Sequence, residues 1–175
     1  MSNLVTTTFP SELGWMAVLW RGAAVARLTF GHRSASAAWQ SLELQSAGSE
    51  PLTGQMAELV ARLRRFARGR PEDFREVPLE WGGRSEFQRA VWRQCRQIPF
   101  GQVLTYAKLA KRLGSPRSAR AVGNAMAANP IPLIVPCHRI VASGGTLGGF
   151  SAPGGLDMKR RLLELETSAT PMKSK

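Results

Sequence analysis

The feature that most restricts how this chain can fold is a run of three prolines within residues 130–136, which encloses the apolar residues 133–135. Proline fixes the φ angle and has no backbone N–H group, so a helix cannot continue through this run. The residue before a proline is pushed away from helical geometry, which here applies to Asn129. The run therefore predicts a buried strand at residues 133–135, which presents Cys137 at its end.

A helix with a clear start signal lies further towards the N-terminus. Ser85 and Gln88 have the spacing of a capping box, which predicts a helix that runs to about residue 98. The apolar side of this helix includes Cys95, which we interpret as a small core residue.

The next two helices and the short turn between them have a helix-turn-helix pattern. Thr105 is placed to cap the first helix, and Gly114 ends it. Ser115 and the proline that follows it predict that the second helix covers residues 116–129. The surface of this second helix carries mostly small side chains around Arg120. This favours shape-based DNA binding with one inserted arginine, although alanines are also simply good helix formers.

The first 83 residues show strand-like and helical patterns but no cluster of catalytic side chains. The elements we expect are strands over 14–20 and 23–30 with a turn at Arg21–Gly22, helices over 35–45 and 55–69, a loop over 46–54, and a linker over 69–83 rich in glycine and proline.

The net charge of +12 is divided unevenly along the chain. Residues 1–83 hold nine Lys or Arg and eight Asp or Glu, whereas residues 84–175 hold fifteen and four. A strongly basic half favours a polyanionic partner, most often nucleic acid, with a solvated basic surface as the alternative. A membrane surface is less favoured, because this half has no basic amphipathic helix with large apolar residues.

Several features lead us to expect a reduced, cytoplasmic setting. The first residues lack the pattern of a signal peptide, and no uninterrupted apolar run approaches the ~20 residues of a membrane helix. Two cysteines are also too few for a disulfide scaffold.

Cys137 and His138 are adjacent, and they are the candidate reactive pair of the sequence. Cations at His138 and Arg139 would lower the pKa of the thiol, and the thiolate is the nucleophilic form. Neighbours in an extended chain point to opposite sides, so His138 would act through a water, or another group would activate the sulfur. The alternative is a cysteine that only packs in the core.

Other chemistries are less well supported. The chain has two cysteines and two histidines, with His32 far from the others, so a zinc site is poorly supported and we expect no metal. A cysteine hydrolase needs an orienting Asn or Asp beside its Cys and His, and Asn129 keeps that possibility open.

The stretch IPLIVPCHRIV resembles the active-site motif of the O6-alkylguanine-DNA alkyltransferases. The upstream ARAVG and NP and the downstream GTLGGFSAPGGLDMKRRLLELE occur in the family's order, so the resemblance covers about residues 85–166. It implies an α+β fold: residues 1–83 form a small antiparallel-sheet, RNase H-like domain with the linker, and residues 84–175 form a mostly helical domain that contains the helix-turn-helix.

The resemblance also implies the reaction. Cys137 would accept the alkyl group from O6 of a guanine that is flipped out of double-stranded DNA, and O4-alkylthymine is a second candidate substrate. The product is a stable thioether, so each molecule acts once, as a monomer and without a cofactor. His138 is similar to the family's water-bridged base, and Glu166 to the carboxylate that orients it. Asn129 would hold the backbone near the cysteine, and Tyr106 would donate a proton to the leaving guanine.

By the same resemblance, other residues would bind the DNA and the flipped base. Arg120 would fill the vacated position in the base stack, and Tyr106 would rotate the phosphate of the target nucleotide. The remaining DNA contacts are Gln88, Ala107, Ser115, Ala119, Ala121, Gly123 and Ser143, and the pocket residues are Val135, Ile140, Phe150, Ser151 and Lys159.

The chain departs from the family pattern in two places. Phe150 stands where the family commonly has Tyr, and the loop FSAPGGL is two residues longer than expected, so the size of alkyl group that the pocket accepts is open. Two alternative functions also remain: a module that binds lesions without chemistry, and a DNA-binding sensor switched by oxidation of Cys137.

Overall fold

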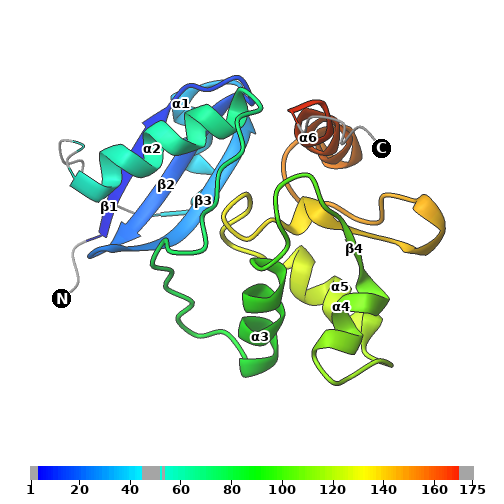
Figure 1. Cartoon of the computed structure of the whole chain (residues 1–175). Coiled ribbons are helices and arrows are strands. Elements are labelled where there is room, and N and C mark those ends of the chain that lie inside the picture. Colours follow the sequence, from blue (N-terminus) through cyan, green and yellow to red (C-terminus); the bar gives the residue numbers. More distant parts are fainter. Residues whose placement is uncertain (1–3, 45–51, 53, 170–175) are drawn as a thin grey trace.

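The computed structural model describes residues 4–44, 52 and 54–169, and it has an α+β fold (Figure 1). Its first three elements form an antiparallel sheet in the order β1 (Leu4–Phe9), β2 (Trp15–Arg21) and β3 (Ala24–His32). The expected hairpin is confirmed, but its turn lies one residue later, because Arg21 pairs with Ala24 across Gly22 and Ala23. Gly22 has a φ of 59°, a left-handed value that favours glycine. The sequence patterns did not predict β1.

Two helices cover opposite faces of this sheet (Figure 1). The side chains of a strand alternate between its faces, so Ala17 and Leu19 of β2 pack with α1 (Ala35–Gln40), while Val18 and Trp20 pack with α2 (Gly54–Ala67). The helix predicted over residues 55–69 is thus confirmed to within two residues. The helix predicted over 35–45 already ends at Gln40, and most of the predicted loop over 46–54 lies outside the described residues.

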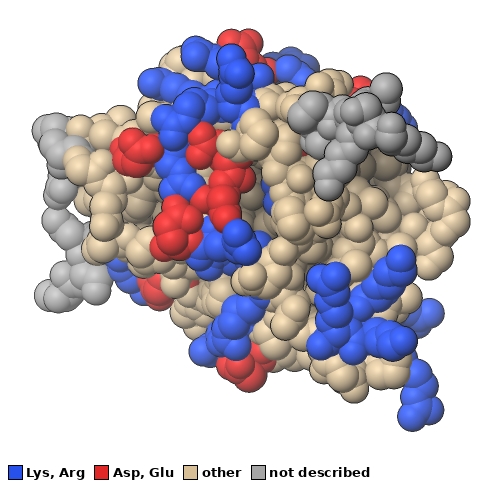
Figure 2. Space-filling model, in the orientation of Figure 1, with Lys and Arg blue, Asp and Glu red and all other residues tan. Residues whose placement is uncertain are grey.

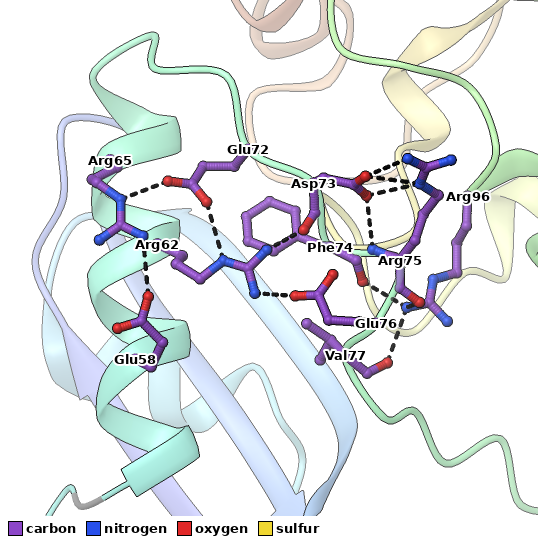
Figure 3. Close-up of polar contacts among 10 residues, drawn as sticks. All are labelled: Glu58, Arg62, Arg65, Glu72, Asp73, Phe74, Arg75, Glu76, Val77 and Arg96. Atoms are coloured by element: carbon purple, nitrogen blue, oxygen red, sulfur yellow. Dashed lines mark hydrogen bonds and ion pairs between the residues drawn. The ribbon is translucent and has the colours of Figure 1, made fainter.

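The irregular segment that follows α2 is held in place by arginines from both sides (Figure 3). Arg62 of α2 pairs with Glu72 at 3.0 Å and with Glu76. Arg96 directly follows α3 (Glu86–Cys95). Its Nη2 donates to the carbonyls of Phe74, Arg75 and Val77 at 2.7–3.0 Å. The predicted linker is therefore tied to both regions that it connects.

The helices of the second half begin largely where their capping residues predict. Ser85 caps α3 through a reciprocal capping box, in which the backbone N–H of Gln88 donates to Ser85 Oγ and the Ser85 N–H donates to Gln88 Oε1. Thr105 caps α4 (Tyr106–Arg112), as expected.

The helix after α4 starts later than the sequence indicated. α5 covers Ala119–Ala127, so the predicted start at Ser115 and the proline after it is wrong. The reason is a turn in which both the backbone N–H and the hydroxyl of Ser118 donate to the Ser115 carbonyl, at 2.9 and 2.6 Å. This turn separates α4 from α5 and preserves the helix-turn-helix arrangement.

The proline run is buried, but the strand predicted at residues 133–135 is wrong. The chain folds back there instead: Leu133 has a φ of 71°, and the Val135 N–H donates to the Ile131 carbonyl at 2.9 Å. Asn129 stabilises the fold-back, because its side chain accepts from the Ile131 N–H and donates to the Val135 carbonyl. A short 3-10 turn at Cys137–Arg139 follows, and β5 (Ile140–Val141) then pairs in parallel with β4 (Leu104–Thr105).

The chain ends, within the described residues, in a 3-10 turn at Ser143–Gly145 and in α6 (Gly155–Ala169). α6 starts two residues before Asp157, so the carboxylate of Asp157 lies in the first turn of the helix. Among the described helices, none is long and apolar enough to cross a membrane.

The fold-back lies between two hydrophobic clusters. Ile131, Leu133 and Ile134 belong to the cluster of the sheet and α2, whereas Val135 and Cys137 belong to the cluster of α3, α4 and α5. The segment thus joins the two halves of the molecule and holds Cys137 at their boundary.

Candidate active site

Cys137 lies at a cavity of about 580 Å³ between the helix-turn-helix and the loop before α6. Its side chain is almost fully buried, with 7 % exposed. Seven of the predicted site residues line this cavity, although they come from distant parts of the sequence. The described residues that line this cavity include Cys137, Tyr106 from α4, Ala119, Arg120 and Gly123 from α5, and Phe150 and Ser151 from the loop.

The thiol of Cys137 is not a resting thiolate. Burial raises the pKa of Cys137, while a hydrogen bond from Asn129 and the positive charge of Lys159 partly oppose the shift. We predicted from the adjacent cations that this pKa would be lowered, and that prediction is wrong. Burial lowers the pKa of His138, which therefore stays neutral, and Arg139 points its guanidinium at Glu166. Cys137 could therefore act as a nucleophile only after a base has removed the proton of the thiol.

His138 is completely buried and bound to a carboxylate. Its Nε2 lies 2.7 Å from Oε1 of Glu166, which is itself 1 % exposed. Burial alone would raise the pKa of Glu166, but hydrogen bonds from His138 and Arg139 bring it down to about 2. Because an ionised carboxylate only accepts hydrogen bonds, we assign the imidazole proton to Nε2. Nδ1 then carries the free lone pair, and it is buried with no hydrogen-bond partner among the described protein atoms.

Arg139 fixes this carboxylate, a role that the sequence did not predict. Nε and Nη2 of Arg139 donate to Glu166 at 2.9–3.1 Å, and Nη1 donates to the Ile98 carbonyl at 2.7 Å. The Gly101 N–H donates to Glu166 Oε2 at 2.9 Å. The adjacency of Arg139 to His138 was the only signal in the sequence, because Glu166 lies 27 residues further along the chain.

Three predicted pocket residues lie one layer behind the cavity wall. Val135, Ile140 and Lys159 are fully buried, and none of them lines the cavity. Lys159 donates from Nζ to the carbonyls of Ile140 and Gly149 at 2.5 and 3.1 Å, and burial lowers its pKa to about 8. The three residues support the site from behind the cavity wall. The positive charge of Lys159 also favours the thiolate form of Cys137.

Tyr106 forms part of the cavity wall next to the loop. Its ring lies beside Gly148, so closely that a Cβ atom on that glycine would be 2.8 Å from Cε2 of Tyr106. Burial raises the pKa of Tyr106, and a hydrogen bond with the Gly149 backbone only partly opposes this. The hydroxyl group therefore carries its proton at neutral pH.

The remaining predicted DNA contacts lie outside the cavity. The side chain of Gln88 takes part in the capping box of α3. The others are exposed: Ala107 on α4, Ala121 on α5, Ser115 in the turn between these helices and Ser143 in the 3-10 turn after β5.

The surface around the cavity is basic. From residue 87 to residue 156 the sequence contains no Asp or Glu. Figure 2 accordingly shows Lys and Arg side chains without acidic neighbours over the part of the molecule where Figure 1 places α4 and α5. This surface can attract a polyanion to the mouth of the cavity.

Comparison with known proteins gives first the class of the domain that holds the site and then the family of the whole chain. Residues 86–168, which contain the helix-turn-helix and the cysteine site, match the family model "6-O-methylguanine DNA methyltransferase, DNA binding domain". The methylated-DNA–protein-cysteine methyltransferase of Haemophilus influenzae is 36 % identical over 172 residues, which cover 95 % of this chain and 88 % of the relative. The chain therefore belongs to the family of methylated-DNA–protein-cysteine methyltransferases.

Solved structures of the same family share the whole fold. The Mycobacterium tuberculosis OGT in complex with DNA has a TM-score of 0.77 and 32 % sequence identity, with 95 % of each chain covered. The O6-methylguanine-DNA methyltransferase of Pyrococcus kodakaraensis has a TM-score of 0.71 and 27 % identity, with 93 % of this chain and 98 % of that chain covered. The α+β fold implied by the sequence is thus confirmed.

Proposed function

We propose that this protein repairs DNA by direct reversal, through one irreversible transfer of an alkyl group from O6 of guanine to Cys137. The observation that carries the proposal is the position of Cys137, at a cavity lined by Tyr106 and Arg120 and backed by the buried His138–Glu166 pair. A base inside the duplex cannot reach a cavity of this kind, so the target guanine must leave the base stack.

The buried pair explains how a thiol with a raised pKa is activated. With Nε2–H held by Glu166, Nδ1 of His138 takes the proton of the Cys137 thiol through one bridging water. The thiolate then attacks the alkyl carbon in line with the bond to O6. A sulfur–carbon bond forms, the carbon–oxygen bond breaks, and its electron pair passes to the guanine.

Tyr106 completes the proton balance. Its protonated hydroxyl donates to the leaving guanine, and the proton held by His138 returns through solvent to the tyrosinate. The thioether at Cys137 has no leaving group as good as guanine, so the protein acts once.

The proposed partner is double-stranded DNA, bound by one protein molecule in the cytoplasm. Residues 84–175 would carry DNA binding and the reaction, and residues 1–83 would support them. Arg120 would occupy the space that the flipped base leaves, while Ala119, Ala121 and Gly123 allow α5 to approach the duplex closely. Contacts of Gln88, Ala107, Ser115 and Ser143 would go to the DNA backbone and would carry no sequence preference.

The test is the intact mass of the protein after mixing with a duplex that carries a single O6-methylguanine. We expect a gain of one methyl group per molecule, and no gain for Cys137→Ala although that variant still binds the duplex. Binding without any gain in the wild type would instead indicate a lesion-binding module. Oxidation of Cys137 that switches binding to one preferred sequence would indicate a sensor.

A further inference from the structure

The aromatic ring of Phe66, near the end of α2, lies next to the imidazole of His138. The two ring centres are 6.1 Å apart and the ring planes are inclined at 62°, in an edge-to-face arrangement. Both side chains are fully buried. Phe66 belongs to the hydrophobic cluster of the sheet and α2, so the first half of the chain contributes directly to the surroundings of the candidate base.

Phe66 also packs against the segment that supports the partner of this base. It meets Phe100 at 5.9 Å with the ring planes at 87°, and the guanidinium of Arg139 lies over the ring of Phe100 at 5.8 Å. Gly101, the next residue of the chain, donates its N–H to Glu166. The ring of Phe66 therefore lies against both the imidazole and the segment that helps to fix its carboxylate.

The segment after α2 restrains Phe66 from a further side. Phe74 packs edge-on against Phe66 at 6.1 Å, and the guanidinium of Arg62 lies 5.0 Å from the centre of the Phe74 ring. Arg96 donates to the carbonyl of Phe74 at 2.7 Å, and Figure 3 shows Phe74 with both arginines. These contacts hold the ring of Phe66 at the boundary between the two halves of the molecule.

The hydrogen bond to Glu166 does not by itself fix the direction of Nδ1 in His138. This bond holds Nε2, but the ring can still turn about the line from Cβ to Nε2, and such a turn moves Nδ1. An edge-to-face contact with a buried aromatic ring favours one angle of this turn. The apolar ring also keeps water away from its side of the imidazole, and burial lowers the pKa of His138.

We propose that Phe66 is a positioning residue for the alkyl transfer, which turns Nδ1 of His138 towards Cys137 and keeps water away from the imidazole. The proposal rests on the transfer reaction proposed above, and Phe66 itself does not line the cavity at Cys137. The titratable groups around His138 are Cys137, Arg139 and, from α6, Lys159 and Glu166. An apolar substitution of Phe66 changes the packing of the base and leaves these charges in place.

The test compares the wild type with Phe66→Leu in single-turnover transfer from an O6-methylguanine duplex, measured by intact mass at saturating DNA. Loss of the aromatic contact should slow transfer by about tenfold, with unchanged affinity for the duplex. Because water then reaches the imidazole, the pKa of His138 rises towards its ordinary value of 6.5, and more of the base is protonated at pH 6 than at pH 8. The ratio of the rate at pH 8 to the rate at pH 6 should therefore rise by about threefold.

Nitrogen NMR of the imidazole groups gives a readout that a loss of stability alone would not change. The chain has two histidines, so a sample labelled with 15N-histidine shows only the signals of His32 and His138, and His32→Gln assigns them. In Phe66→Leu the protonation midpoint of His138 should move to higher pH, while the midpoint of His32 stays the same.

The matched control is Phe9→Leu, which shortens a buried ring of β1 in the same hydrophobic cluster and should leave the transfer rate, the rate ratio and the His138 midpoint unchanged. Phe66→Met is measured alongside, so that the test does not depend on the folding of one variant. A wild-type rate ratio and a wild-type His138 midpoint in the Phe66 variants would overturn the positioning role while methyl transfer still supported the repair function. No methyl gain in the wild type would instead overturn the repair function itself.

Discussion

The imidazole of His138 and the carboxylate of Glu166 meet at 2.7 Å with both side chains buried. The carboxylate is in turn fixed by Arg139 and by the Gly101 N–H. This arrangement holds Nδ1 of His138 as the free base, and it places a permanent negative charge where an imidazolium would form during the reaction. In the mechanism that we propose, proton removal from Cys137 therefore depends on Glu166, a residue that does not touch the substrate.

Glu166→Gln should slow alkyl transfer about 100-fold, because the amide can no longer stabilise the imidazolium. It should also lower the free energy of unfolding by about 3–5 kcal/mol, since Arg139 loses the partner of its buried charge. Single-turnover mass measurements and urea denaturation check the two effects. Glu164→Gln, at an exposed position of the same helix, is the control and should change neither quantity. An unchanged transfer rate in Glu166→Gln would contradict the assigned base.

Gly148→Ala should displace Tyr106 and slow transfer by about tenfold or more. The added Cβ would lie 2.8 Å from the tyrosine ring, at a residue whose φ is 69°. Gly144→Ala is a matched control, because Gly144 has a φ of 78° but nothing within 4 Å of the added atom. Both variants strain the backbone, and only the first moves Tyr106. Equal rates for the two variants would show that the position of Tyr106 does not matter.

Arg96→Met should lower the free energy of unfolding by about 2–3 kcal/mol. It removes the one guanidinium nitrogen that binds three carbonyl groups of the segment between α2 and α3. Arg93→Met on α3 removes an exposed ion pair with Glu86 and should cost less than about 1 kcal/mol. Denaturation curves of both variants test this, and a smaller effect for Arg96→Met than for Arg93→Met would contradict the role that we give to Arg96.

In the absence of DNA, the rate at which iodoacetamide labels Cys137 should rise with pH to a midpoint above the ordinary thiol value. The thiolate is the reactive form, and burial raises the pKa of this thiol. Lys159→Met should slow the labelling below about pH 8 and leave the midpoint nearly unchanged, because Lys159 has a pKa of about 8 and its positive charge favours the thiolate only below that pH. Peptide mapping separates Cys137 from Cys95, and a free cysteine peptide supplies the reference curve. A midpoint at or below that of the peptide would contradict the prediction.

Arg120→Ala should slow transfer from an O6-methylguanine duplex by about tenfold or more, because the flipped state loses the side chain that occupies the vacated stack. Its reaction with the free O6-methylguanine base should keep the wild-type rate, since no flipping is needed. Arg117→Ala removes an exposed arginine of the preceding turn and is the control for charge alone. A wild-type rate of Arg120→Ala with the duplex would show that this side chain is not the wedge.

Local signals were enough to predict most helices of the second half and the β2–β3 hairpin. Capping by Ser85 and Thr105 depends on residues three positions apart, which any reader of the sequence can see. The same local reasoning failed at Leu133, because the left-handed turn there is stabilised by the side chain of Asn129 and by the surrounding core rather than by its own residues. It also failed at Ser115, where a hydrogen bond from Ser118 forms a turn in place of a helix start.

The sequence by itself determined the nucleophile, the helix-turn-helix and the family, because these depend on short motifs. Only the tertiary structure decided how the nucleophile is activated. The pKa of Cys137 depends on burial and on Lys159, and the orientation of His138 depends on a carboxylate 28 residues away. A smaller cavity of about 160 Å³ beside Cys137 likewise depends on the tertiary structure, because residues of β3 and of the loop at Pro153 line it together. Burial and long-range contacts set the electrostatics of the site, and neither is encoded in the spacing of neighbouring residues.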